Sequence, residues 1–248
     1  MIPLKDENPT TSKPVVTVLL ILVCVVVYFG FQQQGDQTEF TYRRAAVPCE
    51  VVTGSPMTAD EIESGDCTRR DSTDPVFPDK GVIAALVTSI FLHGSVLHLA
   101  GNMLYLWVFG NNIEDRMGKP LYLVFYLVAG VMATFAHIAL DPGSTVPLVG
   151  ASGAIAGVMG TYLVLFPRVR IRSLIMFFLI MFRDIEARWL LGIWFVMQFF
   201  TGQESGVAWA AHVGGFAFGV VVGLLWRARG GPASGFRPRG YVEPTPYR

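Results

Sequence analysis

The fold is decided by a segment of small and apolar residues, GASGAIAGVMGTYLVLF, at residues 150–166. As a helix, Ser152 to Phe166 is about 15 residues and covers roughly 22 Å. The hydrocarbon core of a bilayer is roughly 30 Å thick. Counted back from the charged end at Arg168, this helix enters a membrane without crossing it. Ser152 is therefore expected several Å below the far surface.

His212 is expected at the same depth as Ser152. From Arg227 back to His212 is again about 15 residues, or roughly 22 Å. Gly215 and Gly219 form a G-x-x-x-G stripe, which allows another helix to approach closely. The small residues after Ser152 make that helix the best partner. Close contact would bring His212 within hydrogen-bond reach of Ser152, as activation of a nucleophile requires.

The composition indicates an all-α polytopic membrane protein with one domain. Of 248 residues, 52% are hydrophobic and 15% are charged, against about 25% charged in soluble proteins. The net charge is zero, so no nucleic-acid partner is expected. Apolar segments predict six spans, at residues 14–31, 95–111, 120–140, 152–166, 188–201 and 207–226.

Two further apolar segments are too short to cross. Residues 82–92 lead into the second span. Residues 171–182 are expected to be interfacial or re-entrant by length. The alternative for this segment is a seventh span, which would put the two termini on opposite sides.

Basic residues predict the orientation. With six spans, the arginines and lysines of 116–119, 168–188 and the tail share a side with Lys5 and Lys13. The positive-inside rule makes that side cytoplasmic. We expect a short cytoplasmic N-terminus at 1–13, a membrane domain at 14–226 with a long external loop at 32–80, and a disordered cytoplasmic tail at 227–248. The first apolar segment is expected to remain as an anchor.

The long loop holds two of the three cysteines, Cys49 and Cys67. In an oxidising compartment they could pair, and two free thiols are the equal alternative. Cys24, inside the first span, is expected to pack against other apolar residues.

Ser152 has two readings. It could be one more small residue that lets helices pack closely. Alternatively, Pro147 and the glycines break the chain before it, so that a helix N-terminus points free N–H groups at this spot. Such groups stabilise an oxyanion. The hydrolase motif G-x-S-x-G is not matched, because residue 154 is Ala.

His98 and Asn102 are four residues apart and share a helix face near the depth of Ser152. They could complete an oxyanion hole, or hydrogen-bond between helices. We expect His93 to be structural and His137 to be interfacial. Glu114, Asp115 and Arg116 are expected to form a solvated helix end, with a local ion pair in the turn as a further possibility.

Other chemistry fits less well. His93 and His98 do not form H-E-x-x-H, so no metal is expected, and no cofactor is expected. The predicted spans contain no carboxylate pair for an aspartyl mechanism, and a transporter's paired broken helices are not evident.

Four motifs together resemble the rhomboid intramembrane serine proteases over about residues 80–226. They are His93-Gly94-Ser95-Val96-Leu97-His98-Leu99-Ala100-Gly101-Asn102-Met103, Glu114-x-Arg116, Gly150-Ala151-Ser152-Gly153 and Ala211-His212-x-x-Gly215-x-x-x-Gly219. The resemblance implies a six-transmembrane-helix rhomboid-like bundle around a wet cavity. Ser152 would be the nucleophile and His212 the general base. His98, Asn102 and the Ser152 N–H would stabilise the oxyanion.

The substrate implied by the resemblance is a transmembrane segment of another protein, cut near its outer end. Span five and the loop after it would form the gate, and loop 32–80 would lie partly in the membrane. A multi-pass protein of a bacterial inner (plasma) membrane is the expected setting. A non-catalytic relative that binds transmembrane segments is the alternative within the family.

The chain departs from the family pattern at two places. Many relatives have an aromatic residue four positions after the serine, where this chain has Ala156. Phe216, Trp209 or Tyr162 could replace it beside the histidine. The second departure is the family's Trp-Arg feature, which is absent because loop 32–80 has no tryptophan. This absence bears on how the loop lies in the membrane and not on Ser152 and His212.

Overall fold

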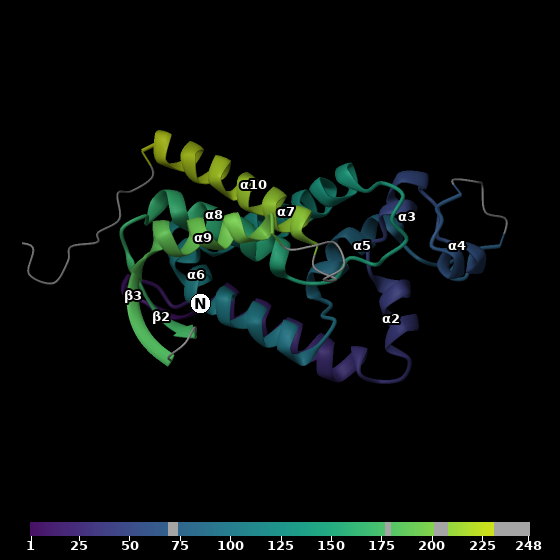
Figure 1. Cartoon of the computed structure of the whole chain (residues 1–248), viewed down its shortest axis with the longest axis horizontal. Helices are drawn as coiled ribbons and strands as arrows, with labels where there is room; N and C mark the ends of the chain where they lie inside the picture. The colour runs from purple at the N-terminus through teal and green to yellow at the C-terminus, as the bar shows by residue number, and fades with distance from the viewer. Residues whose placement is uncertain (69–73, 177–179, 201–207, 231–248) are drawn as a thin grey trace, which may run out of the picture.

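The computed structural model of the chain describes residues 1–68, 74–176, 180–200 and 208–230. These ranges are mostly helical (Figure 1). The helices are α1 (Val15–Val27, continued by a π turn Tyr28–Gln32), α2 (Gln37–Arg44), α3 (Pro48–Thr53), α4 (Ala59–Ser64), α5 (Val82–Thr88, continued by a 3-10 turn Ser89–Phe91), α6 (Val96–Met117), α7 (Lys119–Leu140), α8 (Ser152–Leu165), α9 (Ala187–Gln198) and α10 (Trp209–Ala228).

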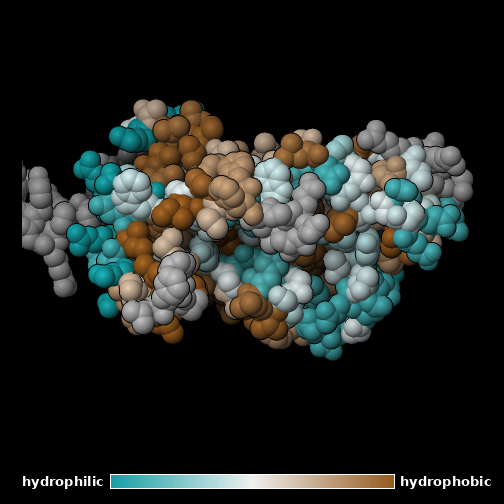
Figure 2. Space-filling view, viewed as in Figure 1, coloured by the Kyte–Doolittle hydropathy of each residue, from teal (hydrophilic) through white to brown (hydrophobic). Residues whose placement is uncertain are grey.

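The chain is a multi-pass membrane protein. Among the described residues, three helical segments are long and apolar enough to span a bilayer: Val15–Gln32, Lys119–Leu140 and Trp209–Ala228. The pair Val82–Phe91 and Val96–Met117, bent by 80° at its break, passes the same test only when its two helices are taken together as one broken span. The predicted fourth span is the shorter apolar helix Ser152–Leu165. Figure 2 shows apolar surface gathered over the central helices and hydrophilic surface toward both ends of the long axis.

Helix α8 is the centre of the fold. Residues 153–162 of this helix are all buried, and α6, α7, α9 and α10 pack around it. A short helix that is apolar on every side can be stable only when other helices enclose it. This enclosure fixes the position of Ser152 at the first turn of the helix.

Glycines bring α10 into backbone contact with α8, as predicted from the small residues. A Cβ atom added at Gly219 would lie 1.9 Å from the carbonyl oxygen of Gly157, and one at Gly160 would lie 2.2 Å from that of Phe216. Thr161 Oγ1 also donates to the Gly219 carbonyl at 2.8 Å. Only residues without a side chain permit this approach.

A small antiparallel sheet corrects the all-α prediction. Its strands, in the order β1-β2-β3, are β1 (Ile2–Asp6), β2 (Arg170–Met176) and β3 (Ile180–Glu186). The segment 171–182, predicted to be interfacial or re-entrant, lies in the β2–β3 hairpin, except for 177–179, which are outside the described residues. The hairpin is stabilised by pairing Lys5 with Arg172 and Asp6 with Ile171. Residues 2–6 and 170–176, which are far apart in the sequence, thus lie side by side in one sheet.

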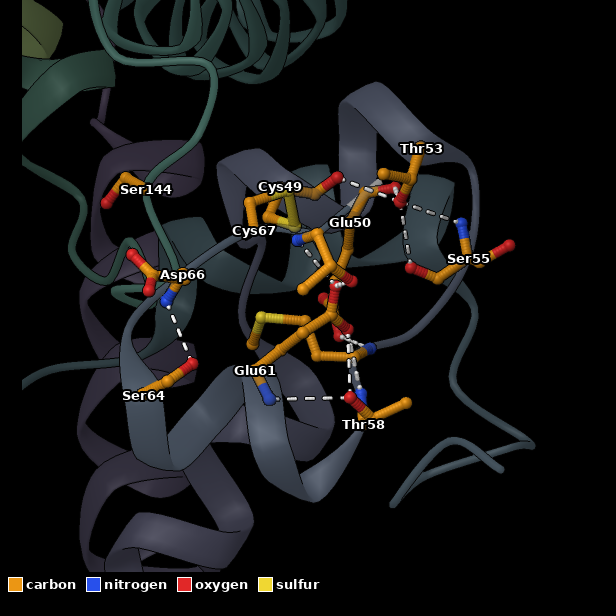
Figure 3. Close-up of a disulfide and its surroundings, with 12 residues drawn as sticks. Cys49, Glu50, Thr53, Ser55, Thr58, Glu61, Ser64, Asp66, Cys67 and Ser144 are labelled. Carbon is orange, nitrogen blue, oxygen red and sulfur yellow. Dashed lines mark hydrogen bonds between the residues drawn. A yellow bond between two sulfur atoms is a disulfide. The ribbon is translucent and has the colours of Figure 1, made fainter. Parts of the chain in front are cut away.

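Residues 37–68 and 74–80 form a compact unit, here called the disulfide cap. Cys49 and Cys67 are joined by a disulfide (Figure 3), which resolves the alternative left open by the sequence. Lys80 Nζ pairs with the buried Glu50 carboxylate. The cap (α3, α4) and the sheet (β2, β3) lie at opposite ends of the long axis (Figure 1).

The disulfide cap is bonded to the segment that leads into α8. Leu148 N–H donates to the Ala46 carbonyl at 2.8 Å, and Cys49 N–H to the Ser144 carbonyl at 3.0 Å. Ser89 joins the same network, because its hydroxyl accepts from Ala46 N–H at 2.6 Å. The backbone before Ser152 is therefore held from two sides.

The prediction of a solvated end for α6 was wrong. Glu114 is 1% exposed. Its carboxylate accepts from the backbone N–H groups of Val16 and Thr17 at 2.9 and 2.8 Å, and Asp115 accepts from Thr11 and Ser12. Glu114 satisfies free N–H groups at the start of α1, and Asp115 binds the segment just before it. Both partners lie about a hundred residues away, so local sequence does not reveal them.

Candidate active site

The backbone turns sharply at Gly150, just before α8 begins. Gly150 has a φ of +127°, which other residues rarely adopt. Its N–H donates to the Ser89 carbonyl at 3.0 Å. The helix then starts at Ser152, and no side chain among the described residues caps it. The N–H groups of the first turn, at Ser152 and the residues after it, therefore have no acceptor within the helix.

Ser152 and His212 meet. The distance from Ser152 Oγ to His212 Nε2 is 2.8 Å, which is hydrogen-bond reach for a serine and a base. The contact joins the first turns of α8 and α10. Backbone contact between these two helices is what brings the two side chains together.

Two residues of α9 complete the surroundings of His212. Gln198 Oε1 lies 2.8 Å from His212 Nδ1. The ring of Trp194 lies 5.8 Å from the imidazole, centroid to centroid. Neither residue was predicted to belong to the site. A usable signal existed, because Gln198 is the single amide side chain of a predicted span that is otherwise almost entirely apolar.

The aromatic ring beside His212 is that of Trp194, which was not among the three residues predicted for this place. Of the three predicted substitutes, Phe216 packs on Trp194 at 5.9 Å. Tyr162 instead donates to Asp6 at 2.8 Å, at the other end of α8. Trp209 lines the cavity and contacts Phe199. The aromatic that faces His212 thus comes from α9.

His98 and Asn102 lie opposite the turn before Ser152. A Cβ atom at Gly150 would lie 2.9 Å from His98 Nε2 and 3.6 Å from Asn102 Nδ2. Asn102 is 8% exposed, and its Nδ2 has no hydrogen-bond partner among the described residues. A buried amide donor that lacks a partner is costly, so its position next to the site is informative.

The four predicted site residues line one cavity of about 910 Å³. Its wall also contains Tyr105, His137, Asp141, Trp194 and Trp209. His137, expected to be interfacial, is therefore at this cavity. His93 is fully buried, and its backbone exchanges two hydrogen bonds with the Gln32 side chain, a structural role as predicted.

Among the described residues, the one cluster of potential metal ligands is Cys49, Glu61 and Cys67. Both sulfurs belong to the disulfide, so neither is a thiolate that could bind a metal. The site at Ser152 offers instead a hydroxyl, an imidazole and N–H donors. This set can support attack on a carbonyl carbon and stabilise the oxyanion that follows.

Comparison with known proteins agrees with this reading. The Rhomboid domain model matches residues 80–229. The chain is 32% identical over 160 residues to the human presenilin-associated rhomboid-like protein, mitochondrial, covering 60% of this chain and 41% of that protein. A zebrafish (Danio rerio) counterpart is 31% identical over 157 residues, 58% and 39% of the two chains.

A bacterial relative is also similar. Rhomboid protease GluP of Bacillus subtilis is 41% identical over 78 residues, 32% of this chain and 15% of that protein. The match spans about two-fifths of the length of the mitochondrial relatives. Because relatives are named from mitochondria as well as from a bacterium, they give the predicted bacterial plasma membrane no support over a mitochondrial one. The matched domain covers more than half of the sequence, and the chain belongs to the rhomboid family.

Proposed function

We propose that this chain is an intramembrane serine endopeptidase that hydrolyses peptide bonds in or near transmembrane segments of other membrane proteins. The observation that carries the proposal is the 2.8 Å distance between Ser152 Oγ and His212 Nε2. A protease named among the relatives supports the same reaction class. No metal or cofactor is required by this chemistry.

Acylation begins when Ser152 Oγ attacks the carbonyl carbon of the substrate peptide. His212 Nε2 takes the hydroxyl proton, so that the oxygen attacks as an alkoxide-like nucleophile. The carbonyl oxygen becomes an oxyanion. Asn102 Nδ2, His98 and the N–H groups at the start of α8 are the donors that stabilise it.

Collapse of the tetrahedral intermediate breaks the C–N bond. His212 gives its proton to the leaving amine, and an ester of Ser152 remains. Water then attacks the ester carbonyl, with His212 again accepting a proton. The ester bond breaks, and the acid product leaves with Ser152 protonated once more.

The proposed arrangement in the membrane has six spans, with α8 and α9 as the two short ones. Both termini are cytoplasmic, the disulfide cap is external, and residues 227–248 form a tail, of which 231–248 lie outside the described residues. The pairing of β1 with β2 supports a shared side for residues 2–6 and 170–176. The proposed gate is α9 with the loop after it, whose residues 201–207 lie outside the described ranges.

A serine-directed fluorophosphonate tests the proposal on the detergent-solubilised protein. The wild type is expected to be labelled at Ser152, identified by peptide mass spectrometry, because His212 activates that hydroxyl. Ser152→Ala should abolish labelling and cleavage of a reconstituted transmembrane substrate. Ser173→Ala is the matched control, since Ser173 is buried in β2 and its hydroxyl donates to the nearby Ile171 carbonyl. Equal labelling of wild type and Ser152→Ala would overturn the proposal.

A further inference from the structure

Gln198 is a buried polar residue at the end of an apolar helix. Gln198 is 7% exposed. Its amide Nε2 donates to the Trp194 carbonyl, one turn earlier in α9, at 2.9 Å. A carbonyl can only accept, so the NH₂ group must face Trp194 and the amide oxygen must face away from it.

That oxygen faces His212. Gln198 Oε1 lies 2.8 Å from His212 Nδ1, and an amide oxygen can only accept a hydrogen bond. The proton of the neutral imidazole must therefore be on Nδ1. Nε2 is then left with a free lone pair, directed at the Ser152 hydroxyl 2.8 Å away.

We propose that Gln198 is a positioning residue, which holds His212 in the tautomer that can accept the proton of Ser152. The inference rests on the proposed function and deepens it. The hydrogen bonds run in one direction, from the Ser152 hydroxyl to Nε2 and from Nδ1–H to the glutamine oxygen. The Trp194 carbonyl fixes the far end, so the order of donors and acceptors is set by the α9 backbone.

A neutral amide suits this location better than a carboxylate. An ionised group inside a membrane domain carries a large desolvation cost. The amide oxygen supplies the orientation that a buried carboxylate supplies in soluble triads, without a buried charge. As the imidazolium forms, the bond from Nδ1–H becomes charge-assisted and strengthens.

Within the part of the chain that the structure describes, no other group competes for this nitrogen. Among the described residues, Ser152 and Gln198 are the hydrogen-bond partners of the His212 ring. The titratable groups that share the cavity are His98, Tyr105, His137 and Asp141. The ring of Trp194 covers the imidazole on the α9 side, which helps to exclude water from the amide contact.

Nitrogen-15 NMR of histidine-labelled protein tests the tautomer directly, because the chain has only four histidines. His212→Ala identifies the His212 signals. In the wild type above the titration range, Nδ1 is expected to be protonated and Nε2 bare. Gln198→Leu should lose this pattern, since the side chain keeps its bulk but has no acceptor. Gln32→Leu is the matched control, a second buried glutamine that bonds to His93 and does not touch His212.

Kinetics give the second readout. Gln198→Leu is expected to lower kcat by roughly 10- to 100-fold at unchanged KM, the loss of one hydrogen bond to a developing charge. Gln198→Glu should restore activity at high pH and move the acidic limb of the pH–rate profile upward by at least about one unit. A carboxylate there favours the imidazolium, which cannot accept a proton.

The outcomes separate the two proposals. If the fluorophosphonate still labels Ser152 in the wild type while Gln198→Leu keeps both the Nδ1–H signal and its kcat, the positioning role is wrong and the protease stands. A fall in kcat with an unchanged tautomer also overturns it, because the residue is then merely structural. If Gln198→Leu does not fold, Gln198→Glu decides, and an unmoved acidic limb overturns the inference.

Discussion

Asn102 is a buried donor for which a reaction at Ser152 would supply the partner. Its amide nitrogen is buried, has no partner among the described residues, and points toward the turn before Ser152. A buried donor without a partner costs roughly 1–3 kcal/mol. A substrate carbonyl that turns into an oxyanion would supply the missing acceptor.

Asn102→Ala is therefore expected to lower kcat by roughly 10²–10³-fold, as the loss of one oxyanion donor does elsewhere. KM should change little, because the bond strengthens mainly in the transition state. Asn111→Ala, on the same helix near its far end, is the control. Cleavage assays on the reconstituted protein measure both, and wild-type kcat in Asn102→Ala would remove it from the oxyanion hole.

The residues predicted from sequence are those whose chemistry is visible locally. A serine after a helix break and a histidine in an apolar span both stand out against their neighbours. Gln198 also stands out as an amide in an apolar span, but its role and that of Trp194 depend on how α9 is rotated toward α10. Rotation about a helix axis follows from packing, which one sequence does not specify.

At the scale of the elements, the contact between α8 and α10 determines the site. Gly157 and Gly219 let the two backbones touch. Ser152 lies between one and two turns before Gly157, and His212 lies two turns before Gly219. A change in the spacing of the two helices therefore moves both side chains.

Gly219→Ala should separate the helices, because its Cβ would lie 1.9 Å from the backbone of Gly157. We expect a lower melting temperature, from an overpacking cost of about 1–3 kcal/mol or more, and weaker fluorophosphonate labelling. Gly192→Ala in α9 meets nothing within 4 Å and should be neutral or slightly stabilising. Equal melting temperatures and equal labelling of the two variants would contradict this account.

The sheet shows where prediction by element fails. Residues 170–173 read Arg-Ile-Arg-Ser, an alternation that the structure resolves into exposed arginines with buried Ile171 and Ser173. That period is typical of a strand. The apolar content and length of 171–182 favour an interfacial segment instead, and the partner strand β1 lies about 165 residues earlier, beyond any local pattern.

At the scale of the molecule, Asp6 ties the first strand to the buried core. Its carboxylate accepts from Tyr162 at 2.8 Å and from Asn112 at 2.5 Å. Burial raises the pKa of Asp6 from 3.8 to about 6, against the opposing effect of these hydrogen bonds. The folded chain therefore holds a proton that the unfolded chain has released between these values.

The contribution of Asp6 to stability should consequently fall as pH rises from about 4 to about 6, and it is lost above the folded pKa. Asp6→Asn keeps an acceptor for Tyr162 and cannot ionise. We expect it to raise the free energy of unfolding at pH 7.5 by up to about 3 kcal/mol and to flatten this part of the pH dependence. Melting curves from pH 4 to 8 measure both, with Asp184→Asn, exposed on β3, as the control. An unchanged curve in Asp6→Asn would show that the carboxylate does not carry the effect.

The general plan of the molecule was within reach of the sequence, because hydropathy and charge report directly on the bilayer. The disulfide cap was not. Its bonds to Ser89 and Leu148 are made by the Ala46 backbone, the Leu148 N–H and one hydroxyl, and backbone pairing between distant segments leaves no mark on composition.

The position of β1 at the edge of the sheet has a consequence for biosynthesis. Residues 2–6 leave the ribosome long before residues 170–186, the strands they join. Until β2 is made, β1 has no strand to pair with, and until α8 is made, Asp6 lacks its hydrogen bond from Tyr162. The sheet must then be assembled after most of the helices have been made, and residues 2–6 of a nascent chain arrested before residue 170 should be open to protease.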